Sequence, residues 1–289
     1  MTHMRRMSKL FVTAVAASIG TASFAQTQDW DSIQITPHEV AAGLYYLEGS
    51  GGNIGLLIGD DGIIMIDDQF APLSDKILAA IRGISDKPIR FLINTHVHGD
   101  HTGGNANFGG MGIPIVASDN VYLRLSQGGA AAAALPVLTF SGPVALHLNG
   151  QDISVLPAPP AHTDGDSYIY FKGSDVIHAG DVFRTIAYPR VDTENGGTFE
   201  GTLRALQMLI DLAGPNTKII PGHGVVSTRD DVIAFRDMAI EVRDRVSRLK
   251  REGKSLEQIV AAKPTADLDA KWSFGPPDLL LPVLYAELP

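Results

Sequence analysis

The feature that most constrains this chain is residues 94–104, Asn-Thr-His-Val-His-Gly-Asp-His-Thr-Gly-Gly. Within six positions it places four metal-capable side chains: His96, His98, Asp100 and His101. The mostly apolar run before it predicts a buried strand, and the glycines within it predict a sharp turn. Strand side chains alternate, so residues 96 and 98 can point to one place and the residues after them to a second place nearby. Imidazole and carboxylate groups without a thiolate suit zinc, iron or manganese.

The segment His-Val-His-Gly-Asp-His resembles the HxHxDH motif of the metallo-β-lactamase fold superfamily, which includes glyoxalase II thioesterases, lactonases, phosphodiesterases and β-lactamases. The resemblance extends from about residue 38 to about residue 226. It implies an α+β fold, a four-layer αββα sandwich of two packed sheets with helices outside. We expect residues 38–289 to form this domain, with a C-terminal helical extension over about 229–289.

The resemblance also implies the metal ligands, because three later segments match ligand-bearing positions of the superfamily. They are Pro-Ala-His-Thr-Asp-Gly-Asp with His162, His-Ala-Gly-Asp-Val-Phe with Asp181, and Pro-Gly-His-Gly with His223. The implied first ion binds His96, His98 and His162, and the second binds Asp100, His101 and His223, with Asp181 bridging. Asp67 matches a position that supports a ligand from behind, although it also fits an ordinary helix N-cap region.

Two Zn²⁺ ions about 3.5–4 Å apart can share one hydroxide, and zinc lowers the pKa of bound water to about 7. We expect this metal-bridging hydroxide to attack an ester, thioester, lactone or amide (β-lactam) bond of a small-molecule substrate. Asp100 is the expected catalytic residue, holding the hydroxide in line and moving a proton beyond its ligand role. The predicted activity is that of a metal-dependent hydrolase.

Two cues within the superfamily conflict. The chain has no cysteine, which excludes the thiolate-bearing β-lactamases, and a bridging Asp181 favours glyoxalase-like, esterase, lactonase or phosphodiesterase members. Export favours a β-lactamase. The alternative is a non-haem iron oxidoreductase resembling persulfide dioxygenases, in which His96, His162 and Asp181 alone form a two-histidine, one-carboxylate site. The second ligand set, including His223, favours two metals.

The N-terminus predicts export. Three basic residues precede an apolar stretch that ends in Ser-Phe-Ala, so residues 1–25 read as a signal peptide cleaved after Ala25, which predicts a periplasmic protein. Residues 26–37 read as a polar linker. Cleavage removes three of the 23 basic residues and none of the 32 acidic ones, leaving 20 against 32, a net charge of −12. This balance argues against nucleic-acid binding, and no later stretch predicts a membrane span.

Hydrophobic patterns predict the remaining elements. Strands are expected over residues 43–48, 54–58, 62–66, 89–93, 113–117, 144–148, 153–156, 167–171, 175–179 and 217–220, and helices over 74–84, 119–125, 198–212, 229–251 and 255–262. The loop over residues 184–197 should rim the pocket. There Arg184, Tyr188 and Arg190 are candidates for binding an anionic substrate group, or else are solvated or structural loop residues.

Overall fold

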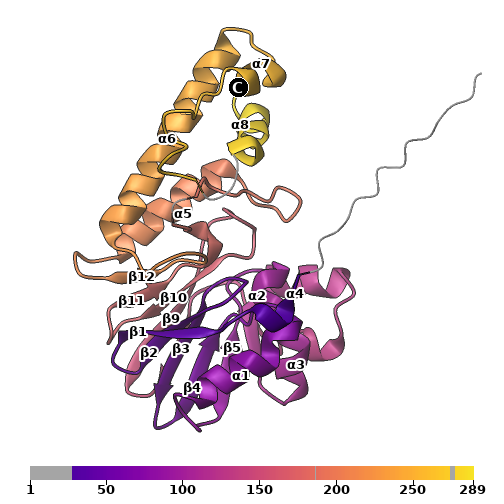
Figure 1. Ribbon diagram of the computed structural model, residues 1–289, viewed down its shortest axis with the longest axis vertical. Coiled ribbons are helices and arrows are strands. Elements are labelled where there is room, and N and C mark those ends of the chain that lie inside the picture. The colour runs from indigo at the N-terminus through magenta and orange to yellow at the C-terminus, as the bar shows by residue number, and fades with distance from the viewer. Residues whose placement is uncertain (1–27, 186, 274–276) are drawn as a thin grey trace, which may run out of the picture.

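The computed structural model describes residues 28–185, 187–273 and 277–289, so the predicted signal peptide lies outside the described residues. Two sheets form its centre (Figure 1). The first sheet has the order β1 (Thr36–Ala41), β2 (Leu44–Glu48), β3 (Ile54–Gly59), β4 (Gly62–Ile66), β5 (Ile89–Ile93), β6 (Ile115–Ser118) and β7 (Leu138–Phe140). The second has the order β12 (Lys218–Ile220), β11 (Val176–His178), β10 (Ser167–Phe171), β9 (Gln151–Pro157) and β8 (Val144–Leu148).

Helices cover the outer face of each sheet, which confirms the predicted four-layer αββα arrangement. Those on the first sheet's side include α1 (Ser74–Arg82), α2 (Gly99–Thr102), α3 (Asn105–Gly110) and α4 (Asp119–Gln127). Those on the second sheet's side are α5 (Phe199–Leu212), α6 (Arg229–Arg251), α7 (Leu256–Ala261) and α8 (Leu280–Glu287). Figure 1 shows α6, α7 and α8 grouped at one end of the molecule.

Strand β4 shows why the sheets stack in this way. All of its residues are buried, and alternate side chains face opposite sides. Ile64 and Ile66 join the core between the two sheets, whereas Ile63 and Met65 pack in the cluster under α1 and α3. A strand that is apolar on both faces has no face suited to water, so it must lie between two packed layers.

The second sheet is anchored to its helices in the same manner. In β10, Ile169 faces the core between the sheets and Tyr168 faces α5, where its hydroxyl donates to the Ala205 carbonyl at 2.9 Å. Helix α6 begins with a capping box between Thr228 and Asp231. The expected C-terminal helical extension therefore packs on the second sheet's side through a shared apolar cluster.

The predicted polar linker, residues 26–37, differs from expectation where the structure describes it. Trp30–Ser32 form a 3-10 turn, and Thr36 already belongs to β1. Lys76 fixes this segment because its ammonium donates to the carbonyls of Trp30, Asp31 and Ile33 at 2.9, 2.7 and 2.9 Å. These contacts come from a helix more than 40 residues away in sequence, so the local polarity of the segment could not predict them.

No helix within the described ranges is both long and apolar enough to span a membrane.

Candidate metal centre

The seven predicted ligands converge at one edge of the sandwich, because each lies in a segment that follows the end of a strand. His96 and His98 follow β5, Asp100 and His101 begin α2, His162 lies between β9 and β10, Asp181 follows β11, and His223 follows β12. Three groupings of their ligand atoms each lie within 4.8 Å: His96, His98 and His162; His96, His101 and Asp181; and Asp100, His101 and His223. We call the first and last of these the first trio and the second trio.

The first trio consists of three imidazoles with their nitrogens facing one point. His98 Nδ1 lies 3.2 Å from His96 Nε2 and 2.7 Å from His162 Nε2. Ligand nitrogens of one tetrahedral zinc, each about 2.0–2.1 Å from it, are about 3.3 Å apart. The His96–His98 separation matches this value and the His98–His162 separation is shorter, so the three nitrogens converge tightly enough to bind a single small metal ion.

The second trio has similar spacing and includes a carboxylate. Asp100 Oδ2 lies 3.2 Å from His223 Nε2 and 3.7 Å from His101 Nε2. Asp181 lies between the trios, with Oδ1 at 3.2 Å from His101 Nε2 and 3.3 Å from His223 Nε2, and Oδ2 at 3.5 Å from His162 Nε2. One carboxylate oxygen therefore faces each trio, as a bridging ligand requires.

Groups behind the ligands fix which imidazole nitrogen carries a proton. His101 Nδ1 lies 2.7 Å from Asp67 Oδ2, and His162 Nδ1 lies 2.7 Å from the Arg190 carbonyl. Carboxylate and carbonyl oxygens only accept, so each of these Nδ1 atoms must donate. The Nε2 of each neutral ring then directs a lone pair into the cluster, which is the state that a metal ligand needs.

A three-residue relay fixes His96 in the same way. The Thr95 hydroxyl has one proton, and it donates that proton to Asp67 Oδ2 at 2.7 Å. The Thr95 hydroxyl oxygen therefore accepts a hydrogen bond from His96 Nδ1, which lies 3.0 Å away. Asp67 thus orients two ligands, one directly and one through Thr95, from a backbone in the left-handed region at φ 61°.

Asp192 performs this role for His98 and was not identified from the sequence. Its Oδ2 lies 2.6 Å from His98 Nε2, which leaves His98 Nδ1 free to face the first trio. The Asn195 side-chain amide donates to Asp192 Oδ2 at 2.7 Å, and the Asn195 backbone N–H donates to Asp192 Oδ1 at 3.0 Å. Asp192 lies within the loop predicted to rim the pocket, but no motif distinguishes it from other loop carboxylates.

The electrostatics of the cluster divide its histidines into two classes. Burial lowers the pKa of His162 to about 4 and lowers the pKa of His96 well below its usual range. Burial would also lower the pKa of His101, but the nearby Asp181 and Asp67 carboxylates outweigh it and raise that pKa well above its usual range. Burial is likewise outweighed at His223, whose pKa is raised by Asp181 and by its hydrogen bond with Asp100.

The carboxylates respond in the opposite sense. Burial would raise the pKa of Asp181, but the His223 and His101 imidazoles hold it well below its usual range. Among the described residues, the buried atoms without a hydrogen-bond partner include His101 Nε2 and Asp181 Oδ1. Buried polar atoms are normally partnered, and these two face each other at 3.2 Å where a shared metal ion would satisfy both.

Two glycines permit the close packing of this centre. A Cβ at Gly52 would lie 2.1 Å from the His101 ring, and one at Gly222 would lie 2.0 Å from Asp181 Oδ1. The loop over residues 49–53 is tied to the His223 turn. There the Asn53 side chain donates to the carbonyls of Pro221 and Gly224 at 2.9 and 2.8 Å.

The three candidate substrate contacts have different surroundings. The Arg184 side chain is mostly buried, and its Nε lies 3.7 Å from Asp181 Oδ2. Arg190 is exposed and contributes its carbonyl to His162. Tyr188 is buried in the apolar cluster on the outer side of the second sheet, and its hydroxyl donates to Asp269 at 2.7 Å. This arrangement gives Tyr188 a packing role.

Within the described ranges, the three other histidines lie outside the cluster. His178 is buried, with Nε2 2.9 Å from the Asn53 carbonyl. His38 and His147 are exposed or partly exposed and pair with nearby carboxylates.

Comparison with known proteins shows which families and proteins this chain resembles. The family model described as the metallo-beta-lactamase superfamily matches residues 47–223. A curated relative, the 2,4-dinitroanisole O-demethylase subunit alpha of Nocardioides sp. (strain JS1661), is 29% identical over 133 residues, which is 44% of this chain. The match spans only 40% of that relative's length.

Solved structures show the same fold. A metallo-beta-lactamase from Pontibacter korlensis superposes with a TM-score of 0.62 at 17% identity, covering 71% of this chain and 99% of its own. The stereoselective inverting sec-alkylsulfatase Pisa1 from Pseudomonas sp. superposes with a TM-score of 0.68 at 18% identity, covering 87% of this chain and 50% of its own.

Proposed function

Because this chain belongs to the metallo-β-lactamase superfamily, we propose that it is an exported dinuclear zinc hydrolase acting on an ester, thioester, lactone or amide bond. The observation that carries the proposal is the position of Asp181, whose two oxygens face the two trios. A carboxylate shared in this way makes two ion sites into one reaction centre, and paired-ion centres are suited to hydrolysis. The mature protein is proposed to be periplasmic, on the strength of the predicted signal peptide.

Two zinc ions held there would supply Lewis acidity and an activated water near neutral pH. The protein would contribute position and proton transfer. Asp100 is the ligand best placed to take a proton from the attacking water, because its side chain is 28% exposed while His101 beside it is fully buried. The Arg184 guanidinium beside Asp181 would favour a substrate that carries negative charge.

The alternative is a non-haem iron oxidoreductase that uses only His96, His162 and Asp181. Their mutual approach supports that reading, since His162 Nε2 and Asp181 Oδ2 are 3.5 Å apart. However, such a site would leave the second trio without a purpose, although Asp67 orients its buried His101 at 2.7 Å. The full ligand set therefore favours the dinuclear hydrolase.

Elemental analysis of protein expressed with its leader, together with a hydrolysis panel, tests this proposal. The panel contains a chromogenic cephalosporin, a thioester, a lactone and a phosphodiester. It also contains a secondary alkyl sulfate and an aryl methyl ether, because the names of two similar proteins point to those classes.

We expect two zinc ions per chain and one clearly preferred substrate, with both lost in Asp181→Asn. One iron per chain, with oxygen consumption on a persulfide and no hydrolysis, would replace the proposal with the oxidoreductase.

A further inference from the structure

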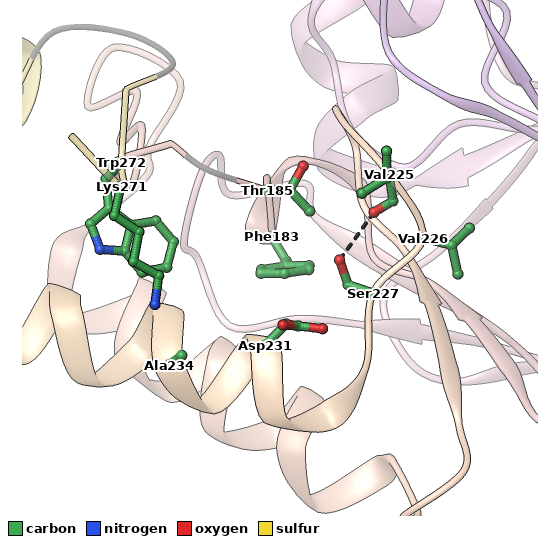
Figure 2. A pocket seen from close by; sticks show the side chains of 9 residues that line it. All are labelled: Phe183, Thr185, Val225, Val226, Ser227, Asp231, Ala234, Lys271 and Trp272. Atoms are coloured by element: carbon green, nitrogen blue, oxygen red, sulfur yellow. Dashed lines mark hydrogen bonds between the residues drawn. The ribbon is translucent and has the colours of Figure 1, made fainter. Parts of the chain in front are cut away.

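A cavity lies beside the metal centre, and none of its lining residues is one of the seven proposed metal ligands. It has a volume of about 210 Å³ (Figure 2). Its lining is mainly apolar. The apolar lining residues are Phe183, Val225, Val226, Ala234 and Trp272, and Lys271 also lines it. Figure 2 shows the Phe183 ring between the Trp272 side and the Val225 side of the cavity.

The cavity adjoins the two turns that carry Asp181 and His223. Phe183 follows Asp181 by two residues and Val225 follows His223 by two, a span of at most about 7 Å of extended chain in each case. Thr185, which also lines the cavity, ties the two turns together by donating its amide to the His223 carbonyl at 3.1 Å. One wall of the cavity and two of the metal ligands, Asp181 and His223, therefore lie on the same pair of hydrogen-bonded turns.

The opposite wall comes from the C-terminal extension. Ala234 is contributed by α6, and the Trp272 ring makes a T-shaped contact with Phe235 of that helix, with ring centroids 5.7 Å apart. Trp272 is 7% exposed, whereas Val225 is 67% exposed. The cavity therefore has a buried aromatic side and an open aliphatic side next to the His223 turn.

We propose that this cavity binds an apolar group of the substrate, a short alkyl chain or a single aromatic ring attached next to the scissile bond. The proposal rests on the hydrolase function proposed above. Ligand cavities are typically lined by apolar and aromatic side chains, and one of about 150 Å³ holds benzene. A cavity of 210 Å³ has room for one ring or about six carbons.

The charged groups at the cavity are accounted for without an ionic ligand. Asp231 lines it, but its carboxylate accepts from the amide and hydroxyl of Thr228 at 2.8 and 2.7 Å as a helix cap. The Lys271 ammonium lies 5.0 Å from the centre of the Trp272 ring. Apolar area is thus what the cavity offers to a ligand.

The test fills the cavity from a residue outside the metal centre. Ala234→Phe places a ring in the space from α6, and Ala79→Phe places the same ring on an exposed position of α1 as the matched control. Both variants are made in a Trp30→Phe background, which leaves Trp272 as the only tryptophan of the chain. Thermal unfolding shows whether each variant remains folded.

Binding is read from Trp272 fluorescence, with neutral 4-nitrobenzyl alcohol as the quenching probe, in zinc-loaded and chelated protein. We expect saturable quenching in both forms and affinity weakened at least about tenfold in Ala234→Phe but unchanged in Ala79→Phe. Quenching that does not saturate, or that is equal in the two variants, would overturn the proposal.

Turnover is read with three thioesters that release a free thiol, which a thiol reagent detects cleanly because the chain has no cysteine. They are the acetyl and hexanoyl thioesters of mercaptoethanol and the acetyl thioester of hexanethiol. Ala234→Phe should lower kcat/KM about tenfold for one of the two substrates that carry a six-carbon chain. The kcat/KM for the acetyl thioester of mercaptoethanol should stay within about twofold of the value without this substitution.

Equal effects on all three thioesters would overturn the proposal while leaving hydrolysis established. If wild-type protein cleaves none of them, thioester hydrolysis fails as the function, and the fluorescence titration still decides whether the cavity binds an apolar group.

Discussion

At the scale of single residues, the metal centre depends on groups that set the tautomers of its ligands. Four imidazoles have a defined outer partner: Thr95 for His96, Asp192 for His98, Asp67 for His101 and the Arg190 carbonyl for His162. Each partner leaves the opposite nitrogen facing the cluster. The chain therefore fixes, before any metal binds, which nitrogen of each of these rings faces the cluster.

Asp192→Asn should weaken metal binding at the first trio. The amide can present its NH₂ group or its weaker carbonyl acceptor to His98 Nε2, so the ring loses the charged acceptor that orients it. Loss of such a partner typically costs about 10–100-fold in metal affinity. Competition with a chromogenic chelator measures this change.

Asp152→Asn is the matched control, because Asp152 also pairs with a histidine at 2.7 Å, but at an exposed site. Equal zinc affinity in wild type and Asp192→Asn would show that Asp192 does not contribute to metal binding.

Asp100→Asn should reduce turnover far more than it reduces metal content at the first trio. Asp100 lies in the second trio, and none of its ion-pair partners is a first-trio residue. An amide cannot accept the proton of an attacking water as a carboxylate does, so a loss of about 10²-fold or more in kcat is expected. Paired measurements of zinc content and kcat test this prediction. A parallel loss of both would show that Asp100 acts only as a metal ligand and not in proton transfer.

At the scale of elements, the glycine-rich loop over residues 49–53 is part of the metal centre. Asn53 holds the His223 turn through two carbonyls, and Gly52 lies against the His101 ring. This loop joins β2 to β3 in the first sheet, and the His223 turn follows β12 in the second sheet, so the Asn53 hydrogen bonds link the two sheets. Movement of the loop would therefore displace ligands of the second trio.

Gly52→Ala should disturb the second trio selectively. The added Cβ would lie 2.1 Å from the His101 ring, which must shift and lose its alignment with Asp67. We expect zinc content to fall from two ions toward one, with the first trio still occupied. Gly110→Ala in α3 is the control, because a Cβ there meets nothing within 4 Å. Retention of two zinc ions in Gly52→Ala would contradict this prediction and show that the loop can move away from His101 without loss of the second trio.

At the scale of the whole molecule, metal binding is linked to pH through the two histidines whose pKa values are raised. Without metal, the folded protein holds protons on His101 and His223 more tightly than the unfolded chain does. Their contribution to stability is therefore present below the unfolded pKa of about 6.5 and is lost as pH rises through the folded values. Metal binding must displace these protons, so it becomes more favourable as pH rises.

The stabilisation that zinc provides should therefore grow with pH. Melting temperatures with excess zinc and with a chelator should differ more at about pH 8 than at about pH 6. At a free zinc concentration of about 1,000 times Kd, the gain is about 4 kcal/mol. A difference that shrinks with rising pH would contradict the raised pKa values of His101 and His223.

The fold and the ligand positions could be predicted from the sequence because four short segments resemble ligand-bearing motifs of the metallo-β-lactamase superfamily. The apolar run over residues 62–66 predicted strand β4, and His96, His98, Asp100 and His101 lie within one short motif. Short glycine-flanked turns likewise marked His223. The segment containing Trp30 was predicted less well, because its conformation depends on a distant lysine.

The sequence by itself therefore determined the pattern of strands and helices and the inventory of metal-capable groups, since strand periodicity and motif spacing are properties of neighbouring residues. The αββα class followed from the resemblance of its motifs to those of the superfamily. Only the tertiary structure decided how those groups are oriented. Asp192 acts on a histidine 94 residues away, and the apolar cavity joins the Asp181 and His223 turns to Trp272 from the C-terminal extension. Such contacts arise where packed layers bring the ends of strands and a distant helix together, and no local spacing encodes them.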